Sequence, residues 1–94
     1  MDFIFKRSAT VEGTPIYFNM PVRGTRFLVK NLTEGDVYVA LKKTENKEEC
    51  LLIPAETAQV VLANEHLYVF GTDVVTVIPD STSEKGVEIQ CLMW

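Results

Sequence analysis

The segment VYVALK, residues 37–42, alternates two kinds of side chain along the chain. Val37, Val39 and Leu41 fall on one side, and the residues between them fall on the other. This period of two is typical of a β-strand with one dry and one wet face. The segment VEIQCLM, residues 87–93, repeats the pattern. In AQVVL, residues 58–62, Val60 and Leu62 fall on one side and Val61 falls on the other.

Further runs rich in Val, Ile, Phe and Tyr predict more strands, because these residues suit a pleated, half-buried surface. The runs are Phe3–Phe5, Pro15–Phe18, Arg26–Lys30, Cys50–Ile53, Leu67–Phe70 and Val74–Ile78. Glycines between runs predict turns with positive φ, namely Gly13, Gly24, Gly35, Gly71 and Gly86. Pro54 and Pro79 are expected to end strands. The polar segments Thr44–Glu49 and Asp80–Lys85 are expected to be exposed hairpin loops.

Eight or nine short strands in 94 residues predict an all-β fold, an antiparallel β-sandwich of immunoglobulin-like or jelly-roll-like type. Ala55–Leu62 could be a short helix, but its Thr and Val residues favour a strand. There is no room for the crossover helices of a parallel sheet. The length suits one domain, residues 1–94, and 47% apolar residues suffice for one core.

The charge balance argues against some classes of function. Nine Lys and Arg against thirteen Asp and Glu give a net charge of −4, which argues against a general nucleic-acid binder. No apolar run approaches the roughly 20 residues of a membrane-spanning helix, and the first ten residues do not resemble a signal peptide. Residues 1–47 carry a net +3 and residues 48–94 a net −7. If the halves occupy different surfaces, the dipole favours head-to-tail packing of copies; if strands of both halves interleave, the asymmetry averages out.

The residues offer little catalytic chemistry. Cys50 and Cys91 are expected to be buried thiols, although a bridge between them stays open in an oxidising compartment. An enzyme could pair Cys50 with His66, but no third orienting group is evident. We expect no enzyme activity, no cofactor and no metal site, since no spacing of His, Cys or carboxylates matches one. Asn31-Leu-Thr33 matches a glycosylation sequon only by chance, and Asn31 is expected to begin a turn.

Four residues are candidates for an interface. Arg23, Arg26 and Lys30 lie close together in sequence around a glycine turn. Without exposed aromatic residues among them, contact with nucleic acid is a minor alternative. Trp94 ends the chain, where it either packs under the sheet or anchors a partner.

Several segments together resemble small β-sandwich structural or accessory proteins of tailed bacteriophages and prophages, over about two thirds of the chain: Phe27–Asn31, Gly35–Val39, Ile53–Ala55, Gln59–Val61, Gly86–Gln90 and Leu92–Trp94. The resemblance implies a virion protein, made in the cytoplasm of a bacterial host, that decorates a capsid or completes a head or tail. Its partners would be further copies of itself or a larger capsid or tail lattice, with no nucleic acid and no membrane. The resemblance carries over no catalytic residue.

A second class of function is a small carbohydrate- or ligand-binding sandwich. In that interpretation Tyr17, Tyr38, Tyr68 and Trp94 line an aromatic platform. The hypothesis requires that these rings converge in one exposed concavity.

Overall fold

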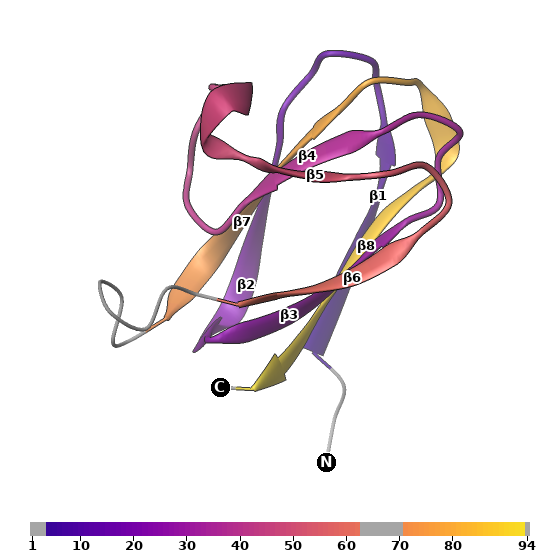
Figure 1. Cartoon of the computed structure of the whole chain (residues 1–94). Coiled ribbons are helices and arrows are strands. Elements are labelled where there is room, and N and C mark those ends of the chain that lie inside the picture. Colours follow the sequence, from indigo (N-terminus) through magenta and orange to yellow (C-terminus); the bar gives the residue numbers. More distant parts are fainter. Residues whose placement is uncertain (1–3, 63–70, 94) are drawn as a thin grey trace.

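The computed structural model describes residues 4–62 and 71–93, and these residues form two packed four-stranded sheets (Figure 1). Sheet A has the strand order β1-β8-β3-β6, and sheet B has the order β2-β7-β4-β5. All of the pairings are antiparallel, as predicted. The elements are β1 (Ile4–Thr10), β2 (Ile16–Gly24), β3 (Arg26–Asn31), β4 (Val37–Ala40), the 3₁₀ turn η1 (Lys47–Glu49), β5 (Leu51–Ile53), β6 (Ala58–Leu62), β7 (Thr72–Pro79) and β8 (Ser83–Met93).

The core lies between the sheets and is built from alternate residues of the strands. Its buried members are Phe18, Met20, Phe27, Val29, Val37, Val39, Ile53, Val75, Val77, Val87, Ile89 and Cys91. The predicted alternation therefore places the side chains of Val37, Val39, Val87, Ile89 and Cys91 inside. In β6 it is Val61 that packs against this core, whereas Val60 and Leu62 are exposed.

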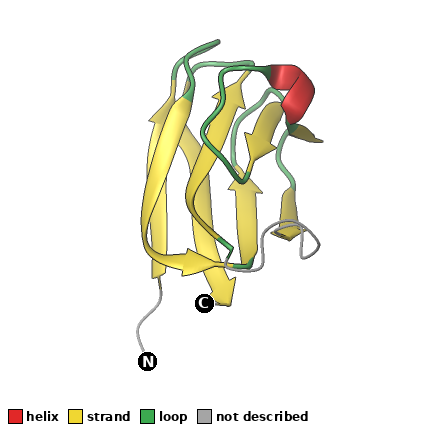
Figure 2. Ribbon diagram, turned by 90° about the vertical axis from the view of Figure 1, so that its left-hand side faces the viewer, coloured by secondary structure: helices red, strands yellow, loops and turns green. Residues whose placement is uncertain are grey.

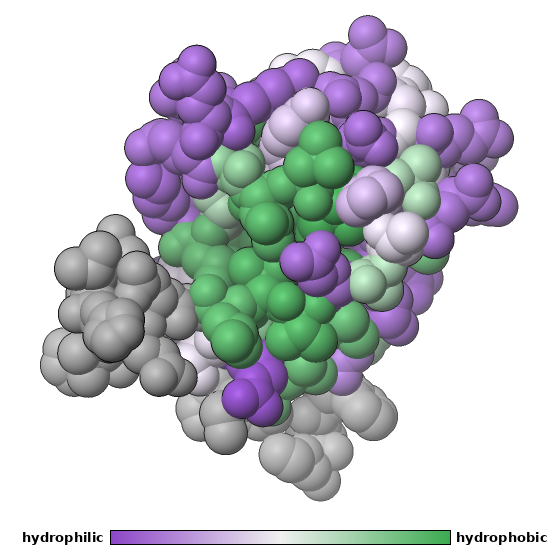
Figure 3. Space-filling model, viewed as in Figure 1, coloured by the Kyte–Doolittle hydropathy of each residue, from purple (hydrophilic) through white to green (hydrophobic). Residues whose placement is uncertain are grey.

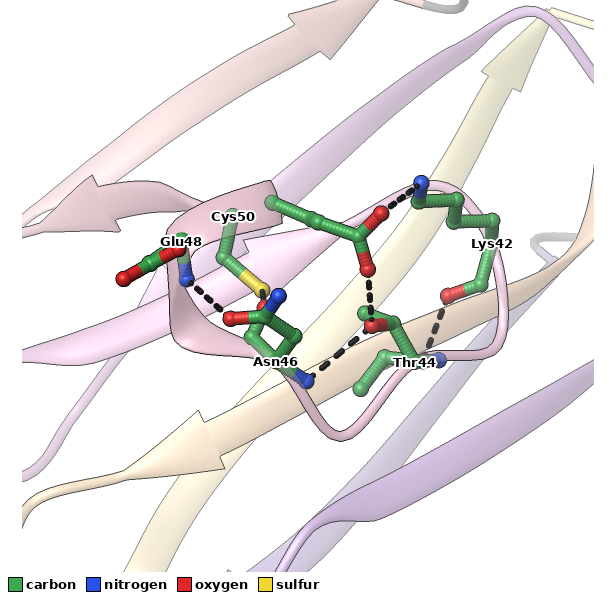
Figure 4. A network of polar contacts seen from close by, with 7 residues as sticks. Lys42, Thr44, Asn46, Glu48 and Cys50 are labelled. Atoms are coloured by element: carbon green, nitrogen blue, oxygen red, sulfur yellow. Dashed lines mark hydrogen bonds and ion pairs between the residues drawn. The ribbon is translucent and has the colours of Figure 1, made fainter.

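The loop between β4 and β5 folds back over the outer face of sheet B. The Thr76 hydroxyl on β7 donates to the Lys42 carbonyl at 2.6 Å and accepts from the Thr44 amide at 3.3 Å. Figure 4 shows the loop's internal contacts, in which the Thr44 hydroxyl receives the Asn46 amide, and Asn46 in turn accepts from the Glu48 amide. This cover explains why Thr76 is fully buried on an outer face.

Two cations of this loop stand over tyrosine rings of sheet B. Lys43 Nζ lies 5.1 Å from the Tyr17 ring centre, and Lys47 Nζ lies 4.8 Å from that of Tyr38. Lys47 also pairs with Asp80 at 2.8 Å, which raises the pKa of that lysine. The predicted exposed hairpin loop thus exists, with η1 within it on the outside of the sandwich (Figure 2), but it is docked rather than free.

A buried polar network joins the two sheets where β3 ends. Asn31 is fully buried, and its side-chain amide donates to the carbonyl oxygens of Gly35, Ile53 and Pro54 at 2.9, 3.2 and 3.0 Å. Its Oδ1 accepts from the amide and the hydroxyl of Thr33. The sequon match therefore has a structural explanation, since this Asn holds a turn together.

Three expectations about turns need correction. Gly24 and Gly35 do not adopt positive φ, which occurs at Gly13, Gly71 and Gly86. Gly86 is the most constrained of these, because an added Cβ would stand 1.8 Å from the Ser8 carbonyl oxygen. The segment Asp80–Lys85 is not a hairpin loop: β8 begins at Ser83, and the short connection crosses from sheet B to sheet A.

The sheet order shows whether the basic half, residues 1–47, and the acidic half, residues 48–94, occupy different sheets. Strands β1 to β4 come from the basic half and β5 to β8 from the acidic half, and each sheet contains two strands of each. The halves therefore interleave, and the asymmetry does not divide the molecule between its two sheets.

No helix in the described part is long and apolar enough to cross a membrane.

Candidate interaction surface

The outer face of sheet A carries a row of four residues in register, of which three are apolar and the one on β8 is a glutamine. Phe5 on β1 pairs with Gln90 on β8, which pairs with Leu28 on β3, which pairs with Val60 on β6. These four residues form one row, because directly opposed residues of neighbouring strands project from the same face. Leu62 lies two residues further along the same face of β6, and Leu92 follows Gln90 at the point where β8 shifts its register against β3.

These side chains are unusually exposed for their type. The exposed fractions are 51% for Phe5, 47% for Val60, 59% for Leu62 and 40% for Leu92. Leu51 and Leu52 of β5, the edge strand of sheet B, are exposed to a similar degree. Figure 3 shows hydrophobic residues gathered in the middle of the view, where Figure 1 has β5 and β6 in front. We call the set Phe5, Leu28, Leu51, Leu52, Val60, Leu62 and Leu92 the apolar surface.

An ion-paired cluster borders this surface in the next row of sheet A. The Glu88 carboxylate on β8 forms ion pairs with the Arg7 guanidinium at 2.6 Å and with the Lys30 ammonium at 3.1 Å. The Arg7 hydrogen bond, followed by that of Lys30, holds the pKa of the Glu88 carboxyl below its ordinary value. The cluster keeps the Glu88 carboxylate charged, and its three side chains carry one net positive charge.

The structure separates the basic residues that the sequence grouped together. Arg26 and Lys30 lie on the outer face of sheet A, four residues and roughly 13 Å apart along β3. Arg23 lies on β2 in sheet B, where it donates to the Gly71 carbonyl at 2.8 Å and faces Asp73 at 3.8 Å. Arg23 therefore belongs to a different sheet from Arg26 and Lys30. Trp94 lies outside the described residues.

The two residues of the predicted aromatic platform that the structure describes, Tyr17 and Tyr38, do not form an open site. Tyr17 and Tyr38 do share the outer face of sheet B, but each is half-buried with a lysine over its ring. Tyr68 lies outside the described residues. The docked β4–β5 loop thus occupies the space that a sugar ring would need above the two described tyrosines.

The environment of Cys50 does not favour a nucleophile. Burial, followed by the neighbouring Glu49 carboxylate, raises the pKa of the Cys50 thiol, whereas an activated thiol has a lowered pKa. Both Cys50 and Cys91 are free thiols, so the bridge left open by the sequence is not formed. His66 lies outside the described residues. In residues 4–62 and 71–93, no three His, Cys, Asp or Glu side chains gather as metal ligands would.

A shallow hollow of about 390 Å³ lies beside the end of the apolar surface. Its lining residues are Lys30, Asn31, Leu32, Glu56, Thr57, Ala58 and Lys85. Most of these side chains are exposed, and Asn31 is fully engaged in its own network. The hollow therefore lacks the enclosed apolar walls of a typical small-molecule site.

Comparisons with known proteins add no family: no protein-family model, no curated protein and no solved structure matches this chain.

Sequence reasoning did not find the apolar surface. The signal was present in AQVVL, residues 58–62, whose five residues carry no charge, and in Phe5 and Leu92 within predicted strands. Alternation assigns these residues to faces but does not tell which face a second layer covers.

Proposed function

We propose that this chain is a non-enzymatic structural or accessory protein of a phage virion, in capsid decoration or in head or tail completion, which works through protein–protein contacts. The observation that carries the proposal is the apolar surface. Monomeric soluble proteins rarely leave large contiguous apolar areas in water, and such areas commonly mark sites of protein association.

The distribution of polar groups on the two sheets supports the same proposal. The outer face of sheet B is partly covered by the chain's own β4–β5 loop, whereas sheet A presents Phe5, Val60 and Leu62 to solvent. A sandwich that leaves apolar side chains of one face in water is suited to docking. The place in a virion comes from the sequence resemblance.

Purified particles test the proposal most directly. Virions from the strain that encodes the chain would be banded in a density gradient and probed with an antibody against the chain. We expect the chain to band with particles in many copies each. Recovery of the chain only from the particle-free fraction of the lysate would refute a virion role. Flanking portal, capsid or tail genes would agree with it independently.

A further inference from the structure

The four edge strands of the two sheets differ in how they are protected against pairing with another chain. Natural proteins protect sheet edges with charged side chains, proline, register shifts or very short strands. Edge strand β1 carries Lys6 and Arg7, and β2 carries Pro21, Arg23 and a register shift. Edge strand β5 has three residues and is followed by Pro54.

Strand β6 has none of these devices. Its residues Ala58–Leu62 carry no charge and no proline, pair with β3 without a register shift, and include two β-branched residues. Four of its five residues are exposed. Such a strand is an open template for a further β-strand.

The hydrogen-bond register shows which backbone groups of β6 point away from sheet A. The Asn31 amide donates to the Thr57 carbonyl, so Asn31 and Thr57 form a hydrogen-bonded pair. Such pairs alternate along an antiparallel ladder, which turns Gln59 and Val61 toward β3. The amides and carbonyls of Ala58, Val60 and Leu62 therefore point outward, at the edge of the sheet that the described residues form.

We infer that β6 pairs with β6 of a second copy of this chain, antiparallel and centred on Val60, which joins the two A sheets into one eight-stranded sheet. The inference rests on the proposed function, because it names the edge through which the structural protein self-associates. Ala58 then faces the partner's Leu62, and the three outward-pointing residues on each copy give three residue pairs that exchange two hydrogen bonds each.

Charge and shape favour a second copy as the occupant. A two-fold contact brings the same residues together from both sides, so a self-pairing edge must contain no like charges. Both β6 and β5 meet that condition, but β5 has only three residues, whereas β6 has five, and β1 would bring Lys6 and Arg7 of two copies close together. The apolar pair of Leu28 and Val60 would continue across the junction into the same pair of the partner.

The exposed edge strand β5 of the second sheet lies on the side of the sandwich that also carries β6 (Figure 1). Six main-chain hydrogen bonds lie within the range of roughly ten, give or take five, found in specific interfaces.

Sedimentation equilibrium of the full chain over the micromolar range tests the inference. The wild type should form dimers. Val60→Lys places two ammonium groups opposite each other at the two-fold axis, where Cβ atoms are about 5 Å apart. We expect this change to raise the dimer dissociation constant at least about tenfold. The matched control is Val11→Lys, because Val11 is a similarly exposed valine outside both sheets and should leave the constant unchanged.

A cross-link tests the register itself. In a Cys50→Ser background, Val60→Cys should form a disulfide-linked dimer under mild oxidation, since the Cα atoms of a hydrogen-bonded pair stand about 5.5 Å apart. Val11→Cys in the same background should not.

The outcomes separate this inference from the proposed function. Dimers that Val60→Lys leaves unchanged would overturn the β6 pairing while leaving self-association in place. A wild type that stays monomeric, or that adds only a strand of another protein at β6, would also overturn it. The particle experiment decides the virion role in either case.

Discussion

Replacement of Asn31 tests whether the buried polar network holds the two sheets together. Asn31→Ala removes an NH2 group, whose two N–H donors are shared among three carbonyl oxygens, and the acceptor of the Thr33 amide. The carbonyls of Gly35 and Pro54 keep second donors, from the hydroxyls of Thr33 and Thr57. Each lost bond to a carbonyl should therefore cost only about 1 kcal/mol, as for an ordinary intramolecular hydrogen bond.

The Thr33 amide is the more costly loss. It is buried and has Asn31 Oδ1 as its acceptor, so its desolvation adds about 1–3 kcal/mol. Asn31→Ala should lower the free energy of unfolding by about 4 kcal/mol in all, and the midpoint of thermal unfolding by roughly 20 °C.

Urea titration followed by far-ultraviolet circular dichroism would measure the change. The control is Thr33→Val, which removes the hydroxyl but keeps both the Asn31 side chain and the Thr33 amide. It should cost about 1–2 kcal/mol, and the double variant should cost less than the sum, because the two side chains share one network. A loss of under about 1 kcal/mol for Asn31→Ala would refute the reasoning.

Three further changes follow from the structure. The lowered pKa of Glu88 stabilises the fold above the ordinary carboxyl range near pH 4.3, and this contribution is lost as the pH falls through the folded pKa. Glu88→Gln should therefore make the thermal unfolding midpoint less dependent on pH between pH 7 and 3. An unchanged pH dependence would contradict the ion-pair argument. In Gly86→Ala the added Cβ meets the Ser8 carbonyl, so the free energy of unfolding measured by chemical denaturation should fall by more than about 3 kcal/mol. The control Gly13→Ala, in open space, should lower it by about 1 kcal/mol because of its positive φ. Equal losses would count against the close approach. The raised pKa of Cys50 predicts slower alkylation at pH 8 than for a free cysteine, and faster alkylation would reopen the nucleophile hypothesis.

The sequence predicted the all-β class because its evidence is local. Period-two patterns in residues 37–42 and 87–93 depend only on neighbouring residues, and prolines at 54 and 79 end strands through their own geometry. Burial of Cys91 was predictable on the same basis, whereas Cys50, which was also expected to be buried, is only half-buried. Turn conformation was less so, since Gly24 and Gly35 show that a glycine permits positive φ without requiring it.

Position within the sheets was decided only by tertiary structure. Nothing local to AQVVL, residues 58–62, makes it an edge strand, and nothing local to Thr76 predicts that a loop covers it. The separation of Arg23 from Lys30 likewise follows from a chain that changes sheets between β2 and β3. Side-chain alternation is fixed by the backbone of each strand, whereas strand order depends on contacts between residues far apart in sequence, and it is strand order that exposes or covers a face.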